Sequence, residues 1–134
     1  MDETTPSNST DIDLGHISDL TLTASNSALI GSGILWLAIV AVMLIFFRVS
    51  VVEAAVLGIF GILLHWIGEI AHQLGHARAA RKAGYPMIAV RLWGVLSSSI
   101  YPADEPTLPG KIHLSRALGG PIMSGIIGII AALL

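Results

Sequence analysis

Residues 64–82 read LHWIGEIAHQLGHARAARK and place three histidines and one glutamate in a largely apolar segment. On a helix that turns by about 100° per residue, His65, Glu69, His72 and His76 fall within an arc of about 60°. These four side chains therefore share one narrow helix face. Ionisable groups are costly inside a bilayer and usually mark a functional site. His72 and His76 are four residues apart, a spacing that brings two imidazoles to one metal ion.

The composition of the whole chain indicates a membrane protein. Of its 134 residues, 54% are hydrophobic and 12% are charged, whereas about a quarter of the residues in soluble domains are charged. Three apolar segments predict transmembrane helices, at about residues 28–48, 51–82 and 115–134. The absence of cysteine excludes disulfides and thiolate metal sites. Because no basic region precedes the first apolar segment, we expect no cleaved signal peptide.

The segments outside these helices are of three kinds. Residues 1–27 are rich in Ser, Thr, Asp and Asn and predict a flexible acidic N-terminal tail. Residues 87–101 are β-prone, with Gly94 as the expected turn, and predict a strand pair or re-entrant segment at the membrane edge. Residues 102–112 predict a polar loop. The predicted fold class is therefore all-α, with a membrane domain over residues 28–134 that has three transmembrane helices and a short β-prone segment between the second and the third.

The distribution of basic residues predicts the orientation. Six of the seven Lys and Arg residues lie in residues 77–116, and the seventh is Arg48. The positive-inside rule then places residues 77–116 and the N-terminus in the cytoplasm. Arg78, Arg81 and Lys82 are expected to anchor the helix end at the membrane surface, with anionic-lipid binding as a secondary role. We expect a multi-pass protein of a prokaryotic cytoplasmic membrane, whose partners are the lipid bilayer and other transmembrane subunits and not nucleic acid.

The order of motifs over residues 55–134 resembles the site-2 protease family of intramembrane zinc metalloproteases. That family carries H-E-x-G-H-A on a membrane helix, followed by a small β segment and a helix with Gly-Pro-x-x-Asn. This chain reads HQLGHA at residues 72–77 and GPIMS at residues 120–124, with the β-prone stretch between them. The resemblance implies that His72 and His76 are zinc ligands. Glu69, one turn earlier on the same face, is a candidate third ligand because an E-x-x-H pair can coordinate a metal.

Three departures from the family pattern imply that the chain is inactive. The family's glutamate after the first histidine acts as general base toward zinc-bound water, but this position is Gln73, whose amide cannot accept that proton. Ser124 replaces the family's Asn, and the Asp-Gly element that supplies the third ligand has no counterpart before Leu134. We therefore predict no catalytic residue and a pseudo-metalloprotease that acts as an accessory or binding subunit of a membrane complex.

Other interpretations fit the same residues. Histidines in glycine-flanked membrane helices also hold haem or chlorophyll, and His65 and His72 are the candidate ligands of such a tetrapyrrole. A fragment, or a Glu-to-Gln variant at position 73, of an active intramembrane zinc metalloprotease would carry the same motifs. In a purely structural protein, the histidines would only form hydrogen bonds between helices.

Overall fold

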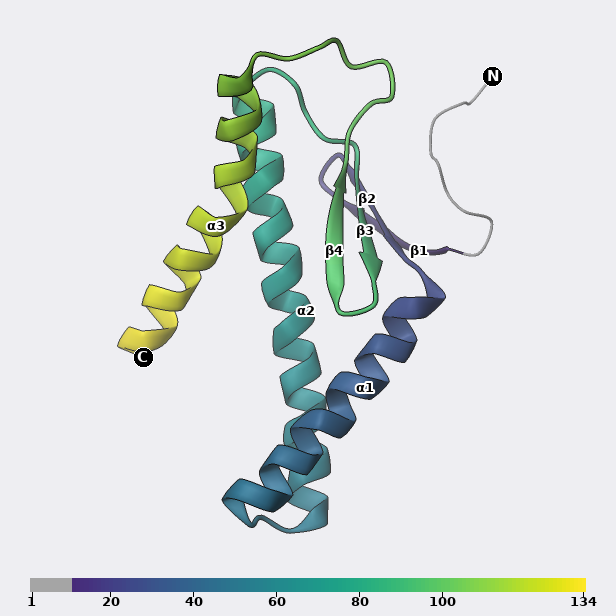
Figure 1. Cartoon of the computed structure of the whole chain (residues 1–134), viewed down its shortest axis with the longest axis vertical. Coiled ribbons are helices and arrows are strands. Elements are labelled where there is room, and N and C mark those ends of the chain that lie inside the picture. Colours follow the sequence, from purple (N-terminus) through teal and green to yellow (C-terminus); the bar gives the residue numbers. More distant parts are fainter. Residues whose placement is uncertain (1–10) are drawn as a thin grey trace.

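The computed structural model describes residues 11–134, which form three long helices and a four-stranded sheet (Figure 1). The elements occur in the order β1 (Ile12–Ile17), β2 (Leu20–Ala24), α1 (Asn26–Val42), the π-helical turn η1 (Met43–Phe47), α2 (Val51–Lys82), β3 (Ala89–Trp93), β4 (Leu96–Ile100) and α3 (Gly110–Leu133). In Figure 1, α2 runs the length of the molecule, α1 crosses its lower half, and the sheet and α3 lie beside its upper half.

The three long helices confirm the predicted membrane segments. Mean hydropathy reaches 2.6 in Asn26–Phe47, 2.0 in Val51–Lys82 and 1.6 in Gly110–Leu133, and each segment is long enough to cross a bilayer. Many of their Leu, Ile, Val and Phe side chains are exposed, as expected for surfaces that contact acyl chains. The chain is therefore an integral membrane protein.

Local signals explain where α2 begins and ends and where α3 begins. At the start of α2, the Ser50 hydroxyl accepts a hydrogen bond from the Glu53 amide and the Glu53 carboxylate accepts one from the Ser50 amide, forming a capping box. After Lys82 the chain turns through Gly84, whose φ is +83°. Helix α3 begins at Gly110, directly after the last proline of the loop, and not near residue 115. The hydropathy pattern located only the apolar part of this helix.

The four-stranded sheet corrects the predicted all-α fold class. Its order is β1-β2-β3-β4, with β2 and β3 parallel and the other pairs antiparallel. The predicted strand pair is present as β3 and β4, which turn at Gly94 with φ +55°. Strands β1 and β2, however, lie within the segment predicted as a flexible tail. This part of the segment forms a strand because Leu20, Leu22 and Ala24 alternate with threonines and become buried. Residues 1–10 of that predicted tail lie outside the described residues.

The main core lies between the sheet and the upper part of α2. Its buried members come from β2, β3 and the residues beside them, and Trp66, Ile70 and Leu74 of α2 pack against them. Each buried Leu or Val stabilises the fold by roughly 1.5–3 kcal/mol. The sheet thus covers part of the α2 face opposite the histidines.

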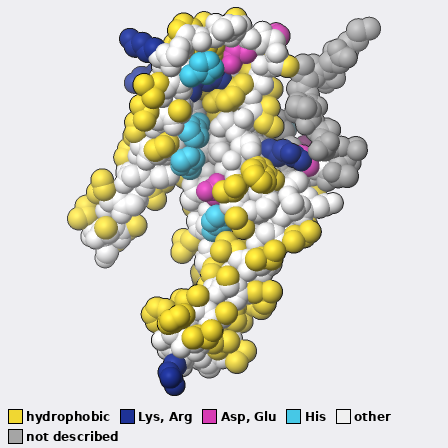
Figure 2. All heavy atoms as spheres, in the orientation of Figure 1, with side chains coloured by type: hydrophobic (Ala, Val, Ile, Leu, Met, Phe, Trp, Pro, Cys, Tyr) yellow, Lys and Arg dark blue, Asp and Glu magenta, His cyan; other side chains and the backbone are white. Residues whose placement is uncertain are grey.

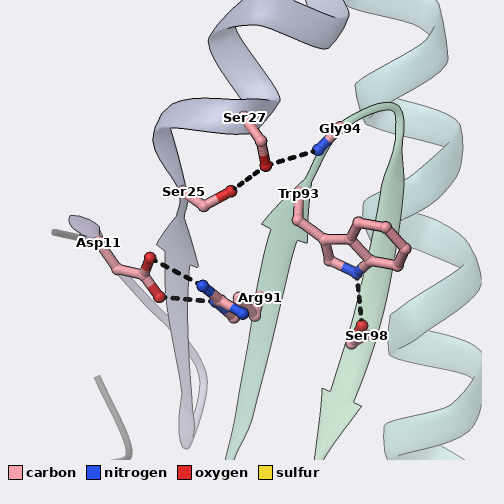
Figure 3. Close-up of polar contacts among 7 residues, drawn as sticks. All are labelled: Asp11, Ser25, Ser27, Arg91, Trp93, Gly94 and Ser98. Carbon is pink, nitrogen blue, oxygen red and sulfur yellow. Dashed lines mark hydrogen bonds and ion pairs between the residues drawn. The ribbon is translucent and has the colours of Figure 1, made fainter. Parts of the chain in front are cut away.

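Polar contacts fasten the residues that flank the N-terminal strands to the β3–β4 hairpin (Figure 3). The Arg91 guanidinium donates to both carboxylate oxygens of Asp11 at 2.7 and 3.1 Å, and this hydrogen bonding holds the pKa of Asp11 below its ordinary 3.8. The Gly94 amide donates to the Ser27 hydroxyl at 3.1 Å. Because β2 pairs with β3, the strand before α1 and the strand after α2 lie side by side. The orientation of the chain in the membrane stays a prediction.

Candidate functional site

A pair of histidines on α2 forms the centre of the candidate site. The Nε2 atoms of His72 and His76 lie 3.0 Å apart, and both outer nitrogens contact α3. His72 Nδ1 lies 2.9 Å from the Ser124 hydroxyl, and His76 Nδ1 lies 2.8 Å from the Arg116 carbonyl oxygen. Because a carbonyl only accepts hydrogen bonds, the 2.8 Å contact with Arg116 assigns a proton to His76 Nδ1, in preference to the longer 3.4 Å contact in which the Gly120 amide would donate to a bare nitrogen. In neutral His76 the lone pair is therefore on Nε2, which faces His72.

Gly120 of α3 provides the space for this pair. A Cβ atom at this position would lie 2.3 Å from His76 Nε2 and 2.4 Å from His72 Nε2. Pro121 follows it, and Ser124 lies one turn farther along α3. The G-P-x-x-S motif thus places bare backbone over the two ring nitrogens and a hydroxyl beside His72.

The geometry of the pair fits two ligands of one metal ion. Two nitrogens on a tetrahedral zinc, each about 2.0–2.1 Å from the metal, are about 3.3 Å apart, which is close to the 3.0 Å separation of the Nε2 atoms. Ligating histidines also usually donate their other ring N–H to an acceptor, as His76 does to Arg116. Within residues 11–134, however, no group of three His, Cys, Asp or Glu residues is placed to hold a metal. Metal binding by His72 and His76 stays a prediction.

Glu69, the candidate third ligand, is engaged elsewhere. Its carboxylate accepts a hydrogen bond of 2.6 Å from the Ser97 hydroxyl on β4. The helix-face argument correctly placed Glu69 beside His72, but the structure turns its carboxylate toward the sheet. A role in metal binding would require this hydrogen bond to be replaced.

Gln73, which the motif resemblance aligns with the family's general base, is buried and held by two serines of β4. Its side chain donates from Nε2 to the Ser97 hydroxyl at 2.9 Å and accepts at Oε1 from the Ser99 hydroxyl at 2.6 Å. Ser97 and Ser99 are two residues apart on one strand and so face the same way. The amide therefore joins α2 to β4 with both of its ends satisfied.

A comparison with solved structures identifies a protein with a similar fold. The chain is similar to the site-2 protease from Methanocaldococcus jannaschii, with a TM-score of 0.59 and 22% identity over 90% of this chain. The chain has a site-2-protease-like fold. It spans about half, 49%, of the length of that protease chain. No protein-family model matches the sequence, and a comparison with curated protein sequences finds no match.

In this site-2-protease-like chain, His65 lies apart from the histidine pair. Its Nε2 is 2.9 Å from the Val95 carbonyl oxygen in the β3–β4 turn. His65 thus holds the tip of the hairpin against α2. His72, the other candidate tetrapyrrole ligand, has its Nε2 against His76, so axial ligation by His72 would have to separate the pair. Tetrapyrrole binding stays a prediction.

A cavity of about 260 Å³ lies beside His76 and contains a group that the residue pattern did not reveal. Arg116 is buried there, with its guanidinium 3.5 Å from the centre of the Tyr101 ring and Nη1 2.9 Å from both carboxylate oxygens of Glu105. Its Nη2 has no hydrogen-bond partner within residues 11–134. His113 also lines this cavity. The sequence feature that could have predicted this buried ion pair is Arg116 itself, an arginine in an apolar helix that follows a loop containing Glu105.

A second hollow, of about 360 Å³, opens between α2 and α3 on the other side of the pair. Figure 2 shows histidine side chains in a row along this face of the molecule. The hollow combines polar, small and apolar residues: Leu64, His65, Gly68, Glu69, His72, Ser124, Ile127 and Gly128. Part of the predicted polar face of α2 thus lines an open hollow between α2 and α3.

Proposed function

We propose that this site-2-protease-like membrane protein lacks proteolytic activity and acts as a binding or accessory subunit of a membrane complex. The observation that carries the proposal is Gln73, an amide at the base position that both Ser97 and Ser99 hold through hydrogen bonds. The fold brings the histidine pair together, whereas the group that would activate water is replaced by one that fastens the sheet to α2.

The chemistry of the pocket supports the lack of activity. Hydrolysis of a peptide bond needs a group that accepts a proton from water, and loss of such a group costs roughly 10²–10⁴ in rate. A neutral amide does not accept that proton. Glu69, the nearest acid on the same face, accepts a hydrogen bond from Ser97. Substitution of Gln73 by Glu would place two carboxylates around Ser97 and is therefore not expected to restore activity by itself.

We also propose that His72 and His76 hold a divalent metal, with zinc as the first candidate. Bound zinc would supply a Lewis acid that polarises an oxygen ligand. The chain's contribution is to fix both rings, since Ser124 and Arg116 hold the outer nitrogens and Gly120 leaves room for the inner ones. Catalytic zinc sites normally have three protein ligands, so two histidines are only part of such a site.

The hollow beside His72 supports a transmembrane partner. Ionisable residues in membrane helices usually face the interior of a bundle, yet His65 and Glu69 line a hollow that opens between α2 and α3. Gly68 and Gly128 on its walls allow another helix to come close. A partner helix seated there would remove these polar side chains from lipid.

Photo-crosslinking tests this contact. A photoreactive residue at Ile127, which lines the hollow, should give a crosslinked protein of one discrete mass in native membranes. The same residue at Ile129, which is exposed on another side of α3, should give mainly lipid adducts. The yields are compared by gel and mass spectrometry. Equal yields of the same protein adducts from both positions would contradict a partner at this hollow.

A second candidate function is proteolysis by a longer chain. The observation in its favour is that the chain spans 49% of the similar protease. Sequencing the gene beyond codon 134 and at codon 73 distinguishes the two. A continuing reading frame with an Asp-Gly element and a glutamate codon at 73 would favour the active protease, and a glutamine codon with no such element favours the inactive subunit.

A further inference from the structure

A groove of about 550 Å³ runs between α2 and α3 and is separate from the site described above. It shares no lining residue with the cavity beside His76 or with the hollow beside His72. Four of its residues come from the end of α2 and four from the middle of α3: Gly75, Arg78, Ala79, Lys82, Gly119, Ile122, Met123 and Ile126.

The two helices touch through bare backbone at the floor of this groove. A Cβ atom on Gly75 would lie 2.4 Å from the Gly119 carbonyl oxygen, and one on Gly119 would lie 2.3 Å from the Gly75 carbonyl oxygen. Beyond this contact α3 diverges from α2 toward its C-terminal end (Figure 1). Ile122 and Ile126, both exposed, form the wall on the α3 side. This end of the groove is therefore an apolar slot.

The other end of the groove is positively charged. Arg78 and Lys82 lie one turn apart at the end of α2, and neither forms an ion pair with any residue in the range 11–134. Arg81, between them in sequence, is paired with Asp19 at 2.9 Å. The groove thus joins two available cations at the end of a membrane helix to an apolar slot that extends along the helices.

We propose that this groove binds an anionic phospholipid, with the phosphate on Arg78 and Lys82 and one acyl chain along Ile122 and Ile126. The charges match a phosphate, and the slot matches the chain attached to it. Basic residues that only anchor the helix at the membrane surface would not need an adjacent apolar slot. They would also not need Arg81 to be paired with Asp19 while Arg78 and Lys82 stay available. The proposal does not depend on the state of the histidine pair.

Native mass spectrometry of the full chain in detergent tests the proposal, with dioleoylphosphatidylglycerol and dioleoylphosphatidylcholine as probes. The anionic lipid should bind more tightly. The substitutions Arg78→Gln and Lys82→Gln should each weaken it about fivefold, from about 1 kcal/mol per basic residue. The matched control is Arg81→Gln, which removes the same charge one residue away and should have less than about a twofold effect. An equal loss with Arg81→Gln would overturn the proposal.

Two further measurements distinguish a phospholipid site from a simple phosphate site and from an uncharged apolar groove. Glycerol 3-phosphate, which has the phosphate but no acyl chain, should not displace the bound lipid at equal concentration. The substitution Ile126→Ser should weaken dioleoylphosphatidylglycerol while circular dichroism shows unchanged helix content. Effective competition by glycerol 3-phosphate would show a simple phosphate site, and equal binding of both lipids would show an apolar groove without charge recognition. Either result would contradict the proposal.

Discussion

The substitution Gly120→Ala is expected to separate His72 from His76 and to weaken zinc binding by about 10–100-fold. The added Cβ would lie within 2.4 Å of both Nε2 atoms, closer than any contact allows. The rings cannot simply rotate away, because Ser124 and the Arg116 carbonyl hold their outer nitrogens. Crowding of this kind also costs about 1–3 kcal/mol of stability. Zinc affinity is measured by competition with a chelator, and stability by thermal unfolding in detergent.

Gly125→Ala is the matched control for this substitution. Gly125 lies on the same helix, and no described atom outside its helix would be within 4 Å of an added Cβ. Alanine is favoured over glycine in a helix by about 1 kcal/mol, so this variant should retain zinc and be at least as stable. Wild-type zinc affinity and stability in Gly120→Ala would contradict the proposed role of Gly120.

The substitution Arg116→Ala is expected to destabilise the protein by about 3 kcal/mol, because it breaks a buried ion pair and leaves Glu105 without its cation. The side chains of Arg116 and Glu105 are only 6% and 19% exposed. Truncation also removes the guanidinium from the Tyr101 ring. Since the Arg116 carbonyl oxygen accepts from His76, any shift of this part of α3 should also disturb the histidine pair. The free energy of unfolding in detergent measures the effect.

Arg81→Ala provides the comparison, because it breaks an ion pair of the same 2.9 Å length on the surface. The Arg81 and Asp19 side chains are 58% and 81% exposed, and such pairs contribute about 0–1 kcal/mol. The double substitution of Glu105 and Arg116 by Leu should recover part of the loss, since it leaves no unpaired buried charge. An equal cost for Arg81→Ala and Arg116→Ala would contradict the buried role of Arg116.

Helix α2 could be predicted from the sequence because its signals are local. Glu53 near its start and Gly84 after its end lie within a few residues of the boundaries that they determine. The i, i+4 spacing then brings His72 and His76 to one face without any knowledge of the rest of the fold. These features need only the geometry of a single helix.

Strands β1 and β2 could not be predicted in the same way. Thr21 pairs with Ala89 and Ala24 with Leu92, so one of the two neighbours of β2 in the sheet is a strand that follows more than sixty residues later. Within the segment itself, a five-residue alternation of apolar and threonine residues is outweighed by the surrounding Ser, Asp and Asn. The alternation with a period of two indicated a strand, but the polar composition of residues 1–27 favoured a flexible tail.

The contacts of the candidate site also could not be predicted, because they involve residues that are distant in the sequence. The sequence indicated that Gln73 replaces a base, but not that Ser97 and Ser99 would hold its amide, because these partners are on a strand 24 and 26 residues away. Helix geometry placed Glu69 on the correct face, but the direction of its carboxylate depends on Ser97. The burial of Arg116 likewise depends on Tyr101 and Glu105, which come from β4's end and the following loop.

Cleavage of a library of transmembrane peptides by the reconstituted full chain tests most directly whether the protein lacks proteolytic activity. The site-2 protease from Methanocaldococcus jannaschii serves as the positive control, and mass spectrometry detects products. With zinc added, the wild-type chain should release no more product than His72→Ala, and Gln73→Glu should give the same result. Zinc-dependent cleavage by the wild-type chain that is lost in His72→Ala would contradict the proposed function.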